Sequence, residues 1–110
     1  MLRMPSQMFY YDRTGQPLAD ITAWDKLHDD IQYRRVAETT VPDGTWISTV
    51  WLGIDHRFSE GPPLIFETMV FPQKGGTLDE RDQVRYSTEV EALAGHEAMV
   101  VKWGGPVQGE

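Results

Sequence analysis

Residues 45–54 read TWISTVWLGI and residues 64–71 read LIFETMVF, and these two stretches decide the fold. Both are rich in β-branched and aromatic residues, which favour strands. Because successive side chains of a strand point to opposite faces, Trp46 and Val50 share one face and Ile47 and Trp51 share the other. A strand with apolar groups on both faces is usually central or covered on both sides. We expect a helix to cover one face and consider a partner chain for the other.

The segments around these stretches predict the remaining elements. Residues 33–41 favour a strand, and Pro42, Asp43 and Gly44 form a turn that joins it to residues 45–54 as a hairpin. Apolar spacing predicts a helix over residues 20–31, capped by Asp20 or Thr22 and ended early by an acidic pair. Residues 8–18 predict either a small hairpin or a short aromatic strand followed by a tight turn at 12–15. The other expected elements are a loop at 72–82 and a short strand at 83–86.

A second helix should follow the last strand. Thr88 and Glu91 form a capping box that predicts its start, and it should run to about Trp103. In helical projection, aliphatic side chains make one stripe with Glu97 in its middle, and His96 lies at the flank of this stripe. The stripe consists of Val90, Leu93, Ala94, Val100 and Val101.

Together these elements predict an α+β fold, with an antiparallel sheet of four to five strands and two helices packed against it. A chain of 110 residues fits a single domain. We expect residues 1–7 and 104–110 to be loose termini.

Composition limits the functions to be considered. The formal net charge of -7 argues against non-specific nucleic-acid binding, which uses a basic surface. The chain has no cysteine, so it has neither a disulfide framework nor a zinc–thiolate site. No apolar stretch is long enough to cross a bilayer, and no signal-peptide core is recognisable, so we expect a cytoplasmic protein.

Three places carry side chains that could bind or react. The loop Asp55-His56-Arg57 could grip a phosphate or transfer a proton, or it could be a polar turn. Glu67 lies in the most apolar stretch, where it either pairs with a cation such as Arg85 or points to solvent. His96 lies in the last helix, where a hydrogen-bonded structural histidine is the alternative to a ligand.

Two functional interpretations use these residues. As a nucleotide-binding protein, the chain would hold phosphate and base with Arg57, Arg85, His56, Tyr86 and Trp51. As a small hydrolase or metal-dependent enzyme, it would use His56, Glu67 and His96, but none of these has a local ligand spacing. Because the sequence also lacks a phosphate-binding glycine loop, a dinucleotide fingerprint and a nucleophile elbow, we predict no catalytic residue, no metal site and no cofactor.

Four segments resemble a family of small accessory proteins of bacteriophages and prophages, notably actinobacterial ones. They are Ser48–His56, Gly61–Phe71, Arg85–Thr88 and Glu91–Glu97. The family is uncharacterised and brings no catalytic role to any position. The resemblance implies a protein that acts in the cytoplasm of a bacterial host.

The phage context suggests that the chain works by binding. Small acidic phage proteins often inhibit host-defence proteins or sequester nucleotide signals. We therefore expect a non-enzymatic protein that blocks or sequesters a host component, with a host protein or a small nucleotide as its partner. The apolar groups on both faces of the central strands also suggest self-association, most simply as a two-fold dimer.

Overall fold

Four antiparallel strands form the centre of the computed structural model, which describes residues 10–55, 61–75 and 79–104. The strands are β1 (Arg35–Thr40), β2 (Trp46–Trp51), β3 (Phe66–Phe71) and β4 (Asp82–Tyr86), and they lie side by side in chain order. The helices are α2 (Ile21–His28), α3 (Ile31–Arg34) and α4 (Glu89–Gly104). This architecture confirms the predicted α+β class and its antiparallel sheet.

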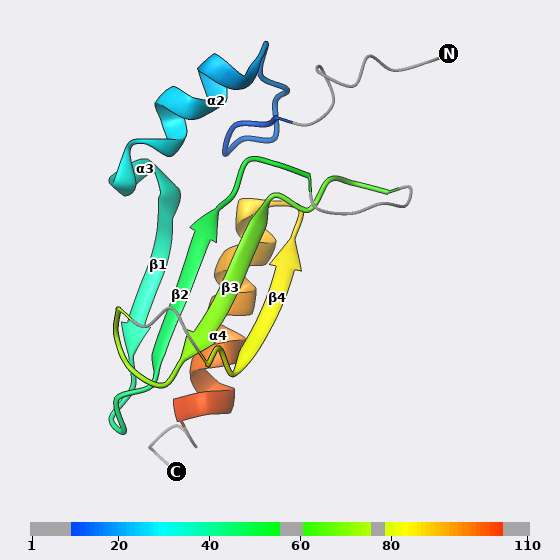
Figure 1. The fold of residues 1–110 in the computed structure, drawn as a ribbon. Coiled ribbons are helices and arrows are strands. Elements are labelled where there is room, and N and C mark those ends of the chain that lie inside the picture. Colours follow the sequence, from blue (N-terminus) through cyan, green and yellow to red (C-terminus); the bar gives the residue numbers. More distant parts are fainter. Residues whose placement is uncertain (1–9, 56–60, 76–78, 105–110) are drawn as a thin grey trace.

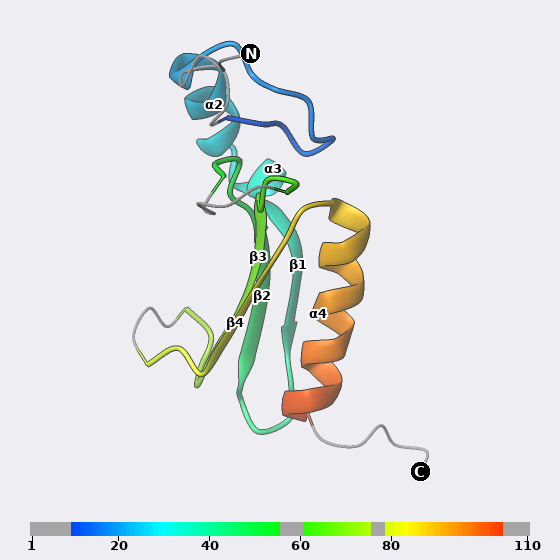
Figure 2. The ribbon, with the colours of Figure 1, turned by 90° about the vertical axis from the view of Figure 1, so that its right-hand side faces the viewer.

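The helices are distributed unevenly around the sheet. α4 lies along one face, while α2 and α3 lie at one end of the sheet (Figures 1 and 2). We call the side covered by α4 the α4 face and the opposite side the open face. Strand alternation and cross-strand register place Ile47, Thr49 and Thr68 on the α4 face, and their neighbours Ser48 and Glu67 on the open face. No helix of the described residues covers the open face.

The core lies between the sheet and α4 and extends, at one end of the sheet, to the segment around Tyr11 and the helices α2 and α3. One cluster is built around Trp51 and Phe66, and a second around Ile47, Val70 and Met99. Trp51 is fully buried, and its indole N–H donates to the backbone carbonyl of Tyr11 at 3.1 Å. The N-terminal segment is thus fixed to the end of the sheet.

Gly53 allows α2 to pack closely against the end of β2. Gly53 has a φ of +75°, which favours glycine, and a Cβ there would lie 2.4 Å from the ring of Trp51 and 2.7 Å from that of Trp24. The Trp24 indole N–H also donates to the carbonyl of Leu52 at 2.9 Å. The absent side chain therefore allows α2 to dock on the chain that leaves β2.

Local signals in the sequence predicted several element boundaries correctly. The Asp20 side chain caps α2, and the reciprocal hydrogen bonds of Thr88 and Glu91 confirm the capping box of α4. The helix expected over residues 20–31 is divided, because Asp30 accepts hydrogen bonds from the first turn of the separate helix α3. Of the strand expected near residues 8–11, residues 8 and 9 lie outside the described part of the chain, and Tyr10 and Tyr11 form isolated bridges.

Other boundary predictions have mixed outcomes. Gly44 has a φ of +97°, as the predicted turn requires. Gly104 belongs to α4 rather than to a loose terminus. The predicted loose ends at residues 1–7 and 105–110 lie outside the described residues.

Most of the aliphatic stripe of α4 faces away from the sheet, and of its large side chains only Val100 packs against the core. Ala92, His96 and Met99 are the buried residues of this helix, whereas Val90 and Val101 are 78% and 51% exposed. Glu97 lies within the aliphatic stripe, so burying this side would also bury an unpaired carboxylate. The opposite side can approach the sheet closely, because Gly95 leaves room for the ring of Tyr86.

Candidate functional site

The open face has an apolar centre. Trp46 on β2 lies opposite Phe71 on β3, with ring centroids 5.5 Å apart. Val50 lies farther along β2 on the same face, and Met69 follows along β3. Trp46, Val50 and Met69 are all partly exposed, whereas Phe71 is only 8% exposed. The face therefore presents aromatic, aliphatic and thioether groups that no helix of the described residues covers.

A buried carboxylate lies beside this centre. Glu67 is only 6% exposed, and its Oε2 accepts from Arg85 Nε at 3.0 Å. The side-chain amide of Gln83 donates to the same oxygen. Because both partners come from the neighbouring strand β4, the carboxylate is neutralised within the sheet. Glu67 and Arg85 are thus paired, which was the first of the two alternatives left open by the sequence.

A second carboxylate lies across the sheet on β1. Glu38 Oε2 accepts from the Trp46 indole N–H at 3.0 Å, and Glu38 also pairs with Arg35 at 3.2 Å and Lys74 at 3.4 Å. Burial acts to raise the pKa of Glu38, but the hydrogen bonds from Trp46 and Lys74 outweigh it and lower the pKa. Glu38 therefore stays ionised and fixes the indole of Trp46.

The α4 face holds a buried polar network around His96. This side chain is 2% exposed, with Nδ1 lying 2.7 Å from Thr49 Oγ1 and Nε2 lying 2.9 Å from Thr39 Oγ1. Thr49 in turn hydrogen-bonds to Thr68. Burial lowers the pKa of His96, partly opposed by Glu97. The neutral imidazole thus links α4 to β1 and β2, as a structural histidine does.

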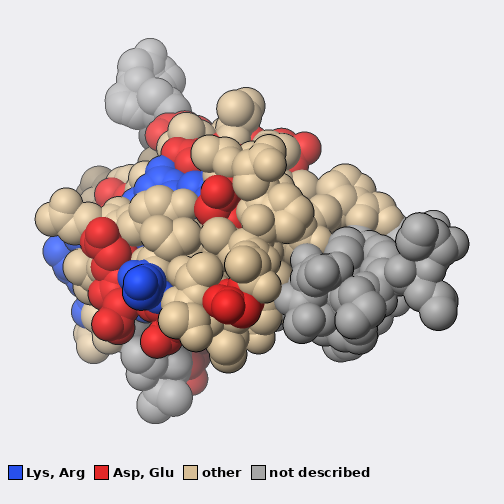
Figure 3. All heavy atoms as spheres, turned by 90° about the horizontal axis from the view of Figure 1, so that it is seen from above, with Lys and Arg blue, Asp and Glu red and all other residues tan. Residues whose placement is uncertain are grey.

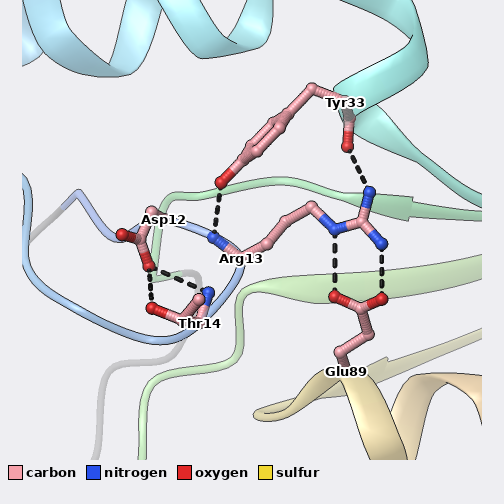
Figure 4. Close-up of polar contacts among 5 residues, drawn as sticks. All are labelled: Asp12, Arg13, Thr14, Tyr33 and Glu89. Carbon is pink, nitrogen blue, oxygen red and sulfur yellow. Dashed lines mark hydrogen bonds and ion pairs between the residues drawn. The ribbon is translucent and has the colours of Figure 1, made fainter.

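Arg13 joins the segment that precedes α2 to the helices α3 and α4 (Figure 4). Arg13 forms a bidentate ion pair with Glu89 at the start of α4. Its guanidinium also donates to the Tyr33 carbonyl at 2.9 Å, and its backbone N–H donates to the Tyr33 hydroxyl at 2.9 Å. The pair with Glu89 raises the pKa of Arg13, so the guanidinium stays protonated.

The residues singled out in the sequence do not form one site. Trp51 is buried at the end of the sheet near Tyr33 and Tyr11, His96 is buried beneath α4, and Tyr86 packs against Gly95 on the same side of the sheet. Glu67 and Arg85 lie together on the open face. The Asp55 carboxylate accepts from the backbone N–H of Leu64 at 3.2 Å, nine residues farther along the chain. His56 and Arg57 lie outside the described residues.

The described residues proposed for a nucleotide site, and those proposed for a hydrolase or metal site, lie in each case on different faces of the sheet. Arg85 and Tyr86 are consecutive on β4, so they point to opposite faces, and Trp51 is inaccessible to a ligand. Glu67 and His96 are likewise separated by the sheet. Within residues 10–55, 61–75 and 79–104, no group of three His, Asp or Glu side chains could hold a metal ion.

Three partly exposed open-face residues were missed as candidates: Trp46, Met69 and Glu38. The alternation of residues 45–54 carried the relevant signal, since it placed Trp46 and Val50 on the face opposite Trp51. The alternation does not predict on which face α4 lies, and the position of α4 decides which of the two faces remains uncovered.

The charges at the α2 end of the molecule are mixed. Seen from this end, acidic and basic side chains are interspersed, and Lys and Arg form no continuous patch (Figure 3). Among the described residues, no helix has the length and apolar character needed to cross a membrane. A scan against protein-family models and searches of curated proteins and of solved structures found no match to this chain.

Proposed function

We propose that this protein is a non-enzymatic binding protein that blocks or sequesters a host protein, and that it contacts this target with the open face. The observation that carries the proposal is the apolar centre of that face, formed by the partly exposed Trp46, Val50 and Met69 and backed by the buried ring of Phe71. Interface cores are enriched in aromatic residues, Met and Arg, and are surrounded by polar groups. The open face has this composition.

The charges around the apolar centre also support docking. Arg35 and Lys74 pair with Glu38, and Arg85 pairs with Glu67. An isolated charge would have to be desolvated on binding, whereas a charge already paired within the sheet carries a smaller penalty. A partner could therefore cover the centre without supplying a counter-charge for each of these side chains.

A protein target accounts for the geometry better than a nucleotide does. Of the described side chains considered for a nucleotide, Arg85 lies on the open face, whereas Trp51 and Tyr86 lie on the α4 face. The open face is an apolar surface with a charged border. The choice of a host target, and of host defence as the process, rests on the resemblance to phage accessory proteins.

The test is capture of a partner from bacterial lysate by the tagged full chain, repeated with two matched variants. Met69→Lys places a charge at the centre of the open face, and Val101→Lys places the same charge on the exposed side of α4. We expect the wild type and Val101→Lys to retain one stoichiometric partner, and Met69→Lys to lose it. Circular dichroism should confirm that both variants are folded.

Two results would contradict the proposal. One is equal capture of the partner by Met69→Lys and Val101→Lys, which would place the binding surface elsewhere. The other is a wild-type protein that captures no partner but releases a nucleotide on heating, detected by mass spectrometry. That result would favour sequestration of a nucleotide signal.

A further inference from the structure

The two edges of the sheet differ in how far they are exposed. At one edge, β1 follows directly from α3, and its register is interrupted between Arg35 and Ala37. Its four middle residues are partly buried. At the other edge, the three middle residues of β4 are exposed, and Figure 1 shows β4 as the outermost strand. Irregular register is a common device that blocks pairing at an edge, and only β1 has it within the sheet.

Free charges at an edge are another device that blocks pairing, but both charged residues of β4 are paired on the faces of their own sheet. Arg85 pairs with Glu67 on β3. Asp82 Oδ2 accepts from Lys102 Nζ at 2.7 Å and from the Trp103 indole N–H at 3.0 Å. Arg85 and Asp82 are therefore each paired with an opposite charge of their own chain. The uncharged Val84, which is 42% exposed, occupies the middle of the strand.

The sequence of β4 is also complementary to itself. If a two-fold axis passes through Val84, antiparallel pairing places Val84 opposite its own copy and Gln83 opposite the partner's Arg85. Asp82 then lies opposite the partner's Tyr86. No like charges face each other, and the central contact is between two β-branched apolar side chains, which favour cross-strand pairing.

We propose that β4 is a dimerisation edge, at which two copies of the chain pair antiparallel around Val84. The product is an eight-stranded sheet with four strands from each copy. A two-fold axis perpendicular to the sheet keeps both α4 helices on one side and both open faces on the other. This inference rests on the edge of the sheet and is independent of the function proposed for the open face.

The absence of cysteine from the chain allows a direct test of register. Directly opposed residues of an antiparallel pair have Cα atoms about 4.5–5.5 Å apart, which is within the range of a disulfide. Under mild oxidation, Val84→Cys should therefore form a disulfide-linked dimer. The matched control is Val101→Cys, which places an exposed thiol on α4, away from the edge, and should form far less.

The same pairing can be tested without a covalent bond, by light scattering and by placing opposite charges at position 84 of the two copies. The molar mass of the wild type should double from 12.6 kDa as its concentration rises. Val84→Lys and Val84→Glu should each remain monomeric, since each places like charges opposite each other. An equal mixture of the two variants should recover the dimer. Circular dichroism should show both variants folded, because Val84 is an exposed residue.

Three outcomes would overturn the proposal. The first is a wild type that stays monomeric up to about 1 mM, a range that would reveal even millimolar dissociation constants. The second is a wild-type dimer that persists in both charged variants, since this would place the interface elsewhere. The third is equal disulfide formation by Val84→Cys and Val101→Cys.

Discussion

The buried His96 should make the stability of the fold depend on pH. Both ring nitrogens lie within hydrogen-bond distance of threonine hydroxyls, and burial lowers the pKa of the imidazole below its ordinary value of 6.5. The unfolded chain therefore binds a proton at a higher pH than the folded chain does. By linkage, the contribution of neutral His96 is complete above about pH 6.5 and is lost as the pH falls below that value.

The size of the effect follows from the same linkage. A single group that is protonated in the unfolded state and neutral in the folded state changes the free energy of unfolding by about 1.4 kcal/mol per pH unit at most. Lowering the pH from 6.5 to 5.5 should thus cost up to about 1.4 kcal/mol. This range lies above the ordinary pKa values of the carboxylates whose pKa is lowered by folding, namely Asp12, Glu38, Asp43 and Asp82.

Urea unfolding between pH 5.0 and 7.5, followed by tryptophan fluorescence, measures the free energy of unfolding of the wild type and of His96→Gln. The variant should be less stable at pH 7.5, because glutamine cannot reproduce the geometry of the imidazole between Thr39 and Thr49. Its stability should change less with pH than that of the wild type. The difference between the two curves isolates the titration of His96.

A flat difference curve between pH 7.5 and 5.0 would refute this reasoning. The same conclusion would follow if acidification stabilised the wild type relative to His96→Gln, since the folded state would then favour the imidazolium. In either case the imidazole could not be a neutral, buried partner of the two threonines.

Three further predictions concern α4 and its contacts. Gly95→Ala should lower the free energy of unfolding by about 1–2 kcal/mol, measured by urea unfolding, although alanine has the better helix propensity. The reason is that the alanine Cβ would lie 2.2 Å from Tyr86 Oη, so Gly95→Ala should no longer destabilise a chain that carries Tyr86→Ala. Glu89→Gln breaks the pair with Arg13 and should cost about 1 kcal/mol at low salt and less in 1 M NaCl, measured by thermal unfolding. Thr88→Ala removes the α4 cap and should cost about 1 kcal/mol in urea unfolding, while an undiminished stability would contradict the capping role.

Boundaries set by local chemistry could be predicted from the sequence. The capping box of Thr88 and Glu91 and the turn at Gly44 depend on residues a few positions apart, so the pattern contains nearly all of the information. The alternation of β2 likewise predicted which residues share a face. Each of these predictions needed only the chain within one element or one turn.

The rotation of α4 and the position of α2 could not be predicted in this way. An aliphatic stripe usually marks the buried side of a helix, but here Glu97 interrupts it and Gly95 favours close packing of the other side. Both effects depend on the sheet, which is distant in sequence. The open face could not be chosen from the sequence for the same reason: the face of β2 that stays exposed is defined only once α4 has docked on the other.

The order of the strands has a consequence for the kinetics of folding. Each strand of the sheet pairs with the next strand along the chain, and the first hairpin closes through a short turn at Gly44. Short loops lose little entropy on closure, so we expect the β1–β2 hairpin to nucleate early and the meander to extend from it. The pair of Arg13 with Glu89 joins positions 76 residues apart and should form late. Its removal should therefore accelerate unfolding and leave the refolding rate nearly unchanged.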